Sequence, residues 1–198
     1  MARFISVVIP NRNGEATIGK CLDAVFSSRY EDFEVIVVDD SSEDASIALI
    51  EKFPCRLLRL EKHSGAARAR NLGALHSKGD TLFFTDADCL LQEDTLSIAS
   101  KTLAGEGPDV VLGGTYTPMP YDRRFFSVFQ SAFIHYAETK NADRPDYIAT
   151  HAMVIDARTF RENNGFAEDF LPILEDVEFS NRLRRAGYRL RMDPQLQV

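Results

Sequence analysis

Two aspartates separated by one residue, Asp86 and Asp88, follow a short apolar stretch at residues 82–85. Such a run is typical of a buried strand, so both carboxylates are expected where the strand ends. Two carboxylates at this spacing can hold one hard divalent cation, Mg²⁺ or Mn²⁺, which can in turn bind phosphate oxygens. The alternative is structural, because an aspartate here can also cap the helix expected to begin near Asp94.

Two further acidic pairs stand where predicted elements meet. Asp39 and Asp40 follow a second apolar run, and their carboxylates can accept hydrogen bonds from the base and ribose of a nucleotide. The same region can instead supply a helix N-cap. Glu175 and Asp176 open a predicted helix, where either could act as general base for an incoming hydroxyl group. Acids are also common at helix starts because they interact favourably with the helix dipole.

The segment from Gly65 to Gly73 combines small residues with two arginines. Gly65 permits close approach of a ligand, and Arg68, near a helix start, can bind a diphosphate in a bidentate fork. The alternative is a helix packed closely through its alanines with its arginines facing solvent. The four histidines are isolated in the sequence, so we interpret each as structural or exposed rather than as a ligand.

The composition is that of an ordinary globular protein of 198 residues, with 44% hydrophobic and 27% charged residues. A formal net charge of −7 argues against sequence-independent binding to nucleic acid, whose phosphates would repel the chain. Three scattered cysteines are too few for a disulfide scaffold, and no apolar run reaches the roughly 20 residues of a membrane span. We therefore expect a cytoplasmic protein.

Alternating strands and helices are predicted along the first half of the chain. Strands are expected at residues 4–9, 33–38, 56–60 and 81–85, and helices at 16–26, 45–53, 66–77 and 94–104. The second half is less regular, with strands at 110–112, 147–155 and 188–192, helices at 124–139, 158–163 and 175–186, and an irregular segment at 165–174. A new strand is expected to start at 195–198. This alternation predicts an α/β fold with a mostly parallel sheet flanked by helices.

Parallel strands bring the candidate residues together. In an open parallel sheet, ligands bind at the carboxyl ends of the strands. Residues 10–13, the pair Asp39 and Asp40, and the triplet 86–88 all stand at such ends, so three separate stretches converge on one crevice. The predicted helix at 124–139 carries phenylalanines at 125, 126, 129 and 133, a pattern more typical of core than of a ligand stack. Exposure of these side chains would indicate a lipid or partner surface.

The motifs taken in order resemble a family 2 glycosyltransferase of the Rossmann-like GT-A fold. Residues 7–13 look like the opening strand and loop of the family, and 37–42 like its second-strand acidic turn. Residues 64–73 resemble its Gly-x-x-x-Ala-Arg-Asn-x-Gly segment, 79–88 its metal motif, and 175–187 its late acidic helix. The resemblance covers nearly the whole chain, and its strength lies in five modest motifs in the right order.

The resemblance implies a nucleotide-diphospho-sugar donor, most often a uridine diphosphate sugar, a divalent cation and inversion at the anomeric carbon. Asp88 would be the principal metal ligand, with Asp86 second, and Asp176 the catalytic base, with Glu175 the weaker choice. The donor is expected to bind at Pro10, Asn11, Asn13, Glu15, Asp39, Asp40, Gly65, Arg68, Asn71, Asp86 and Ala87.

We expect one catalytic domain over 1–198, with a donor-binding half at 1–115 and an acceptor-side half at 116–198. The acceptor-side half is expected to be truncated, because the family often has a further metal ligand and more of the acceptor region beyond this point.

Two alternatives are a nucleotide-sugar-binding module without turnover and a sugar nucleotidyltransferase. The nucleotidyltransferase is less favoured, because such enzymes favour a Gly-rich basic loop after the first strand. The nature of the acceptor and the oligomeric state are not determined by the sequence, and a peripheral association with the cytoplasmic face of a membrane is a further expectation.

Overall fold

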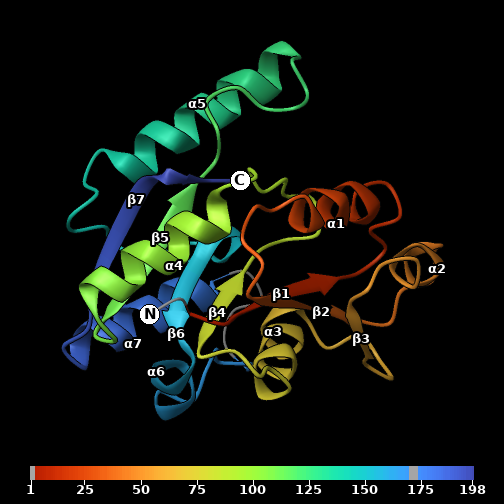
Figure 1. The fold of residues 1–198 in the computed structure, drawn as a ribbon, viewed down its shortest axis with the longest axis horizontal. Helices are drawn as coiled ribbons and strands as arrows, with labels where there is room; N and C mark the ends of the chain where they lie inside the picture. The colour runs from red at the N-terminus through yellow and green to blue at the C-terminus, as the bar shows by residue number, and fades with distance from the viewer. Residues whose placement is uncertain (1–2, 170–173) are drawn as a thin grey trace.

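A seven-stranded sheet forms the centre of the computed structural model, which describes residues 3–169 and 174–198 (Figure 1). Its strands are β1 (Ile5–Asn11), β2 (Phe33–Asp39), β3 (Arg56–Arg59), β4 (Thr81–Phe84), β5 (Val110–Thr115), β6 (Met153–Asp156) and β7 (Arg189–Gln197). Their spatial order is β3-β2-β1-β4-β6-β5-β7, and among these strands only β6 runs antiparallel to its neighbours. The predicted α/β class with a mostly parallel sheet is confirmed.

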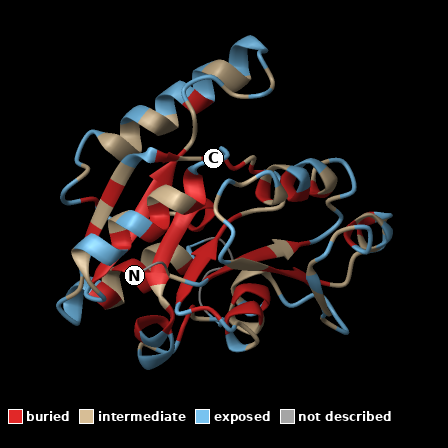
Figure 2. Cartoon of the chain, in the orientation of Figure 1, coloured by how far each residue is buried: buried red, intermediate tan, exposed pale blue. Residues whose placement is uncertain are grey.

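Helices cover both faces of this sheet. One face packs against α1 (Ile18–Phe26), α2 (Ser46–Ile50) and α4 (Thr95–Glu106), and the other against α3 (Ala66–Leu75), α6 (Ala157–Glu162) and α7 (Glu175–Arg185). Strand β1 shows how the sequence builds both cores, because successive strand residues point to opposite faces. Ile5, Val7 and Ile9 join the first core and Val8 joins the second. Figure 2 shows the sheet as the most deeply buried layer.

Four phenylalanines pack together on the face of the sheet that α3, α6 and α7 cover, close to the predicted site. Phe84 ends β4 and packs against Phe160 and Phe166, with ring centroids 5.1 Å apart in each pair. Phe179 of α7 completes the cluster, 5.3 Å from Phe160 and 5.0 Å from Phe166. Tilted and edge-on aromatic pairs of this kind contribute beyond their buried area. The cluster therefore packs α7 against the end of β4. The predicted base lies at the start of α7, and the predicted metal ligands follow β4.

Two predicted strands differ from the structure. The strand expected at 147–155 is shorter, because its first part is a loop followed by the 3₁₀ turn η1 (Thr150–Ala152), and only β6 is extended. Ile148 is buried in that loop, so the apolar pattern reflected burial rather than strand geometry. The strand expected at 188–192 and the new strand expected to start at 195 are one continuous strand, β7. Pro194 is tolerated there because it lies in the register shift between Met192 and Gln197 of the edge strand β7, where it has no partner in β5.

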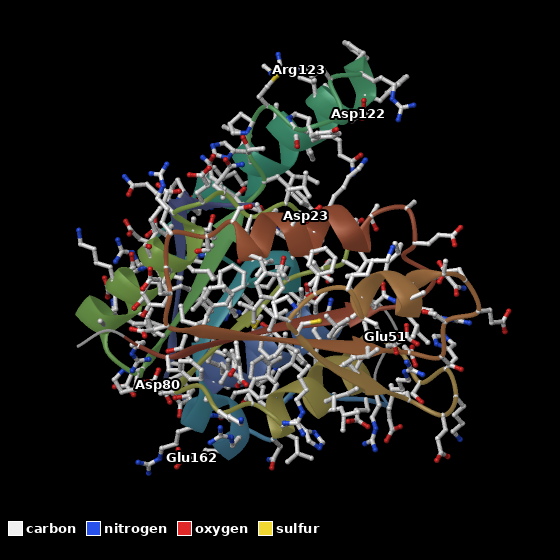
Figure 3. The ribbon with its side chains drawn as sticks, turned by 45° about the vertical axis from the view of Figure 1, so that its right-hand side comes forward. Asp23, Glu51, Asp80, Asp122, Arg123 and Glu162 are labelled. Atoms are coloured by element: carbon white, nitrogen blue, oxygen red, sulfur yellow. The ribbon has the colours of Figure 1, made fainter. Side chains whose placement is uncertain are left out.

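The aromatic helix α5 (Phe125–Thr139) does not form core, which corrects the preference for core packing. It contacts β5 and β7 and extends beyond the sheet at the top of Figure 1. Its aromatic residues are 61–80% exposed: Phe125, Phe126, Phe129, Phe133 and Tyr136. Figure 3 places Asp122 and Arg123 at its outer end. In the described part of the chain, we find no helix with the combined length and hydropathy needed to cross a bilayer.

Candidate active site

A cavity of about 510 Å³ opens at the carboxyl edge of the sheet. The residues that line it come from the end of β1, the turn after β2, the start of α3 and the loop after β4. The predicted donor and metal positions among them are Pro10, Asn11, Asn13, Asp40, Asp86, Ala87 and Asp88. The expected convergence of three strand ends on one crevice is therefore present in the structure.

The Asp-x-Asp triplet presents two carboxylates and one thiol to a common point. The ligand atoms of Asp86, Asp88 and Cys89 lie within 4.8 Å of one another. Burial, together with the neighbouring aspartates, raises the pKa of the Cys89 thiol to about 12, so the sulfur stays protonated. A protonated thiol is a poor ligand, whereas Mn²⁺ and Mg²⁺ prefer oxygen. The donor set thus fits a hard divalent cation held by Asp86 and the exposed Asp88.

Arg70 links this triplet to the start of α7. Its Nη2 donates to Asp86 Oδ1 at 2.6 Å, and its Nη1 donates to Glu175 Oε1 at 2.6 Å. The Arg70 side chain is 5% exposed and the Glu175 side chain 10%. Arg70 was not among the donor-binding residues predicted from the sequence, although it lies two positions after Arg68 in the same segment. Two signals pointed to it: the Gly-x-x-x-Ala-Arg-Asn-x-Gly motif has its arginine at this position, and two residues along a helix turn a side chain by about 200° to another face.

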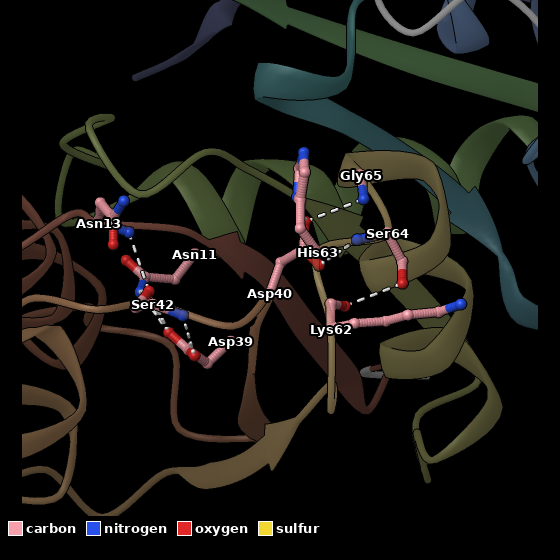
Figure 4. A network of polar contacts seen from close by, with 9 residues as sticks. All are labelled: Asn11, Asn13, Asp39, Asp40, Ser42, Lys62, His63, Ser64 and Gly65. Atoms are coloured by element: carbon pink, nitrogen blue, oxygen red, sulfur yellow. Dashed lines mark hydrogen bonds and ion pairs between the residues drawn. The ribbon is translucent and has the colours of Figure 1, made fainter.

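A second polar network orders the loop before α3 around Asp40. The buried Asp40 carboxylate accepts hydrogen bonds from the backbone N–H of Ser64 at 2.7 Å and of Gly65 at 2.9 Å. His63 Nδ1 lies 2.7 Å from Asp40 Oδ2 (Figure 4). Gly65 has φ +91° and ψ 164°, a conformation essentially restricted to glycine. Gly65 thus serves the local backbone, and His63, interpreted from sequence as structural or exposed, also lines the cavity.

Asp39 occupies the interior of the neighbouring turn. Its carboxylate accepts from Ser42 N at 2.9 Å, Ser42 Oγ at 2.6 Å and Asn11 Nδ2 at 2.9 Å (Figure 4). Asn13 joins through its backbone N–H, which donates to Ser42 Oγ at 2.8 Å. Glu15 Oε2 accepts from Ala45 N at 3.0 Å, at the start of α2. These contacts hold the β1 and β2 loops together, and Asp39 and Glu15 lie outside the set of described residues that line the cavity.

Arg68 and Asn71 face a different part of the molecule. Arg68 is half exposed, and its Nη1 donates to Glu168 Oε2 at 2.9 Å. Asn71 Nδ2 donates to the Phe166 carbonyl at 2.8 Å, and Phe166 N donates back to Asn71 Oδ1 at 2.9 Å. These bonds fasten the segment after α6 to α3. Among the described residues that line the cavity, the arginine contributed by α3 is Arg70.

Asp176 stands next to Glu175 in the first turn of α7. Burial raises the pKa of the Asp176 carboxyl group above its usual 3.8, and the adjacent Glu175 acts in the same direction. The hydrogen bond from Val177 N–H, the backbone of Thr150 and the charge of Arg70 oppose this shift in pKa. The predicted irregular segment that precedes α7 includes residues 170–173, which lie outside the described residues.

A second cavity of about 810 Å³ adjoins the first on the side of α5. Thr17 and Asp88 line both cavities, so the second reaches the metal motif directly. Its other walls include Tyr116 and Tyr121, together with Ile134 of α5. The arrangement therefore provides two adjoining spaces with one acidic group, Asp88, between them.

Comparison with known proteins agrees with this geometry. Residues 6–162 match the family model described as glycosyl transferase family 2. The chain is 30% identical over 131 residues to glycosyltransferase GlyG of Streptococcus pneumoniae, covering 64% of this chain and 44% of that protein. It is 36% identical over 124 residues to glycosyltransferase AglE of Haloferax volcanii, covering 59% of this chain and 41% of that protein. The chain thus spans less than half the length of these two relatives.

Solved structures show the same fold. The mannosyltransferase PcManGT from Pyrobaculum calidifontis, in complex with GDP-Man and Mn²⁺, superposes with a TM-score of 0.80 at 25% identity, covering 100% of this chain and 56% of that one. Staphylococcus aureus TarS in complex with UDP-GlcNAc gives a TM-score of 0.73 at 22% identity, covering 98% and 56%. The family match over most of the chain and the shared GT-A architecture lead to one conclusion: this chain belongs to glycosyltransferase family 2.

Proposed function

We propose that the chain forms the donor-binding and catalytic part of a metal-assisted, inverting glycosyltransferase that uses a nucleotide-diphospho-sugar. The observation that carries the proposal is the cavity at the strand ends, where Asp40, Arg70, Asp86 and Asp88 meet. The mannosyltransferase PcManGT, which shares the fold, was solved with GDP-Man and Mn²⁺. A uridine diphosphate sugar is the donor that the resemblance to the family implies most often.

In this proposal the donor lies along the cavity with its nucleoside toward Asp40 and its diphosphate toward Asp88. The N-terminus of α3 reaches the cavity at Ala66, and helix N-termini favour phosphate groups through their free N–H groups and dipole. Arg70, rather than Arg68, is the arginine of α3 that lines this cavity, beside Asp86. A divalent cation bound by Asp88 and Asp86 would neutralise the charge that develops on the leaving diphosphate.

Asp176 is the proposed general base. The acceptor oxygen forms a bond to the anomeric carbon while the bond from that carbon to the diphosphate oxygen breaks. The leaving diphosphate takes the electron pair, and the acceptor proton passes to Asp176. Burial favours this role because it raises the pKa of Asp176 and so strengthens it as a base. Glu175 is a weaker choice because its carboxylate already pairs with Arg70.

The acceptor is proposed to enter through the second cavity. Its walls combine tyrosine rings with polar groups, a mixture that suits the apolar faces and hydroxyl groups of a saccharide. Asp88 lies at the junction, so an acceptor there would approach the donor beside the metal motif. The candidate acceptors are a saccharide, a lipid-linked molecule and a protein.

The test of the proposed function compares binding with turnover. Calorimetry with UDP and GDP, each with Mn²⁺ and with excess chelator, should show tighter binding in Mn²⁺ for at least one nucleotide. Incubation with UDP-glucose or GDP-mannose should then release the free nucleotide diphosphate, with water as acceptor. Binding without release in the full-length protein would instead indicate a binding module without turnover. Release of pyrophosphate or a nucleoside triphosphate dependence would indicate a nucleotidyltransferase.

We also propose that the full-length protein associates peripherally with the cytoplasmic face of a membrane, and that the exposed aromatic face of α5 provides the contact. Aromatic side chains favour the bilayer interface, and Arg123 and Arg124 precede this face. Flotation with phosphatidylcholine vesicles containing phosphatidylserine should recover the protein. The double substitution Phe126→Ser/Phe129→Ser should weaken partitioning about 10-fold or more, since burying each phenylalanine contributes roughly 1.5–3 kcal/mol.

The matched control for this surface is Leu75→Ser, because Leu75 is an equally exposed apolar residue at the end of α3. Its substitution should leave flotation unchanged. Equal flotation of the wild-type protein and the α5 double variant would contradict a membrane contact through α5.

A further inference from the structure

Arg70 joins three segments that meet only through the folding of the chain. It belongs to α3, it donates 2.6 Å hydrogen bonds to Asp86 after β4 and to Glu175 at the first position of α7, and its side chain is 5% exposed. The two acceptors lie 16 and 105 residues away along the sequence. A buried guanidinium group is costly unless it is paired, and here both terminal nitrogens, Nη1 and Nη2, bind a carboxylate.

The geometry of this contact limits what Glu175 can do. Glu175 Oε1 accepts from the guanidinium, and the Glu175 side chain is 10% exposed. Protonation of this carboxylate would remove the negative charge that balances the buried guanidinium, which is unfavourable because it leaves a buried charge without that partner. Glu175 is therefore suited to hold α7 in place rather than to receive a proton.

The position of Asp176 depends on the same contact. Asp176 is the next residue of α7, whereas Asp86 belongs to the metal motif. The planar guanidinium group of one side chain thus links the metal motif to the residue that precedes Asp176. The aromatic cluster around Phe179 holds the middle of α7, and the Arg70 contact holds its first turn.

We propose that Arg70 and Glu175 form a positioning pair that sets Asp176 relative to the metal motif. This inference rests on the proposed function, because it assigns Asp176 as the base. Catalysis by an oriented group is sensitive to small displacements, and a misplacement of about 1 Å can cost on the order of 10²-fold in rate. Loss of the pair should therefore lower the rate of the chemical step while donor binding persists.

The experiment measures release of nucleotide diphosphate from UDP-glucose or GDP-mannose, whichever the wild-type full-length protein consumes. Glu175→Ala should lower kcat by roughly 10- to 100-fold with donor KM changed less than about threefold. Glu175→Gln should recover most of the rate, because its amide oxygen can still accept from Arg70 Nη1. In an Asp176→Asn background, Glu175→Ala should lower kcat by less than about threefold, since the group that it positions has been removed.

Glu178→Ala is the matched control. Glu178 lies one turn further along α7 and pairs with Arg182, so this variant removes an ion pair from the same helix without touching Arg70. Calorimetric binding of UDP or GDP with Mn²⁺ and thermal unfolding are measured for every variant. These readouts establish that each one folds and retains the donor site.

The outcomes separate the two proposals. If the wild-type protein neither binds a nucleotide diphosphate nor releases one, the proposed function fails. If the wild-type protein turns over but Glu175→Ala is as active as Glu178→Ala, only the positioning pair is overturned. A loss in Glu175→Ala that Glu175→Gln does not recover, or that is as large in the Asp176→Asn background, also overturns it.

Discussion

Replacing Asp176 with asparagine should lower the rate of sugar transfer by about 10² to 10⁴-fold, the usual contribution of a general base. The amide is nearly the same size as the carboxyl group but cannot take the acceptor proton. Donor affinity should remain within about threefold of wild type, because the proposed donor contacts lie on other segments, at Asp40 and Asp88. Single-turnover rates and calorimetric affinities for the nucleotide diphosphate measure the two quantities separately.

The pH dependence of the rate provides a second signature of Asp176. A base works when it is deprotonated, so the rate should fall as the pH drops through its pKa. Burial raises the pKa of Asp176 above the usual 3.8, which places this acidic limb at higher pH than for an exposed aspartate. Glu175 and Arg70 act on the pKa of Asp176, and Asp176 in turn acts on that of the nearby Tyr147. The limb should disappear in the asparagine variant.

Glu175→Gln is the control for the choice between the two adjacent acids. Its rate should fall much less than that of Asp176→Asn, because Glu175 binds Arg70 and does not receive the proton. A near-normal rate in Asp176→Asn, or a loss of donor binding in proportion to rate, would show that Asp176 is only a structural acid at a helix start.

The sequence was informative about the fold because each strand carried its own signal. Val7, Val8 and Ile9 form a β-branched run whose side chains enter both cores. Between such runs, turn residues and apolar residues at helical spacing indicated the helices. The loop at 147–149 was predicted incorrectly because Ile148 is buried without being extended. A hydrophobic pattern reports burial, and burial alone does not distinguish a strand from a packed loop.

Side-chain direction explains what the sequence left undetermined in the site. The motif around α3 has its arginine at Arg70, whereas Arg68 was the arginine assigned to the donor from its place near the helix start. The helix register decides between them, because Arg70 lines the cavity while Arg68 pairs with Glu168. In the same way, Asp39 and Asp40 are adjacent in sequence but alternate across the end of β2. Asp39 therefore faces Asn11 and Ser42, and Asp40 faces the cavity.

The metal motif carries the second large expected effect. Asp88→Ala should abolish the dependence of nucleotide diphosphate binding on Mn²⁺. Residues that merely orient a metal ligand typically contribute 10- to 100-fold to affinity, so loss of a direct ligand should cost at least that much. Asp86→Asn should cost less, because one oxygen of Asp86 is already occupied by Arg70 and the amide can keep that contact through its own oxygen. Calorimetry with UDP or GDP, in Mn²⁺ and in excess chelator, measures the effect.

Asp94→Asn is the matched control for Asp88→Ala, since Asp94 is an exposed aspartate six residues further on whose side chain makes no cap hydrogen bond at the start of α4. It should leave both the binding and its metal dependence unchanged. Because Asp88 is itself exposed, Asp88→Ala should unfold at the wild-type temperature, which separates loss of the metal from loss of the fold. If the wild-type protein binds the nucleotide equally well in excess chelator, Asp86 and Asp88 stabilise the loop after β4 and do not bind a cation. If instead Asp86→Asn removes the metal dependence and Asp88→Ala preserves it, Asp86 rather than Asp88 is the principal metal ligand.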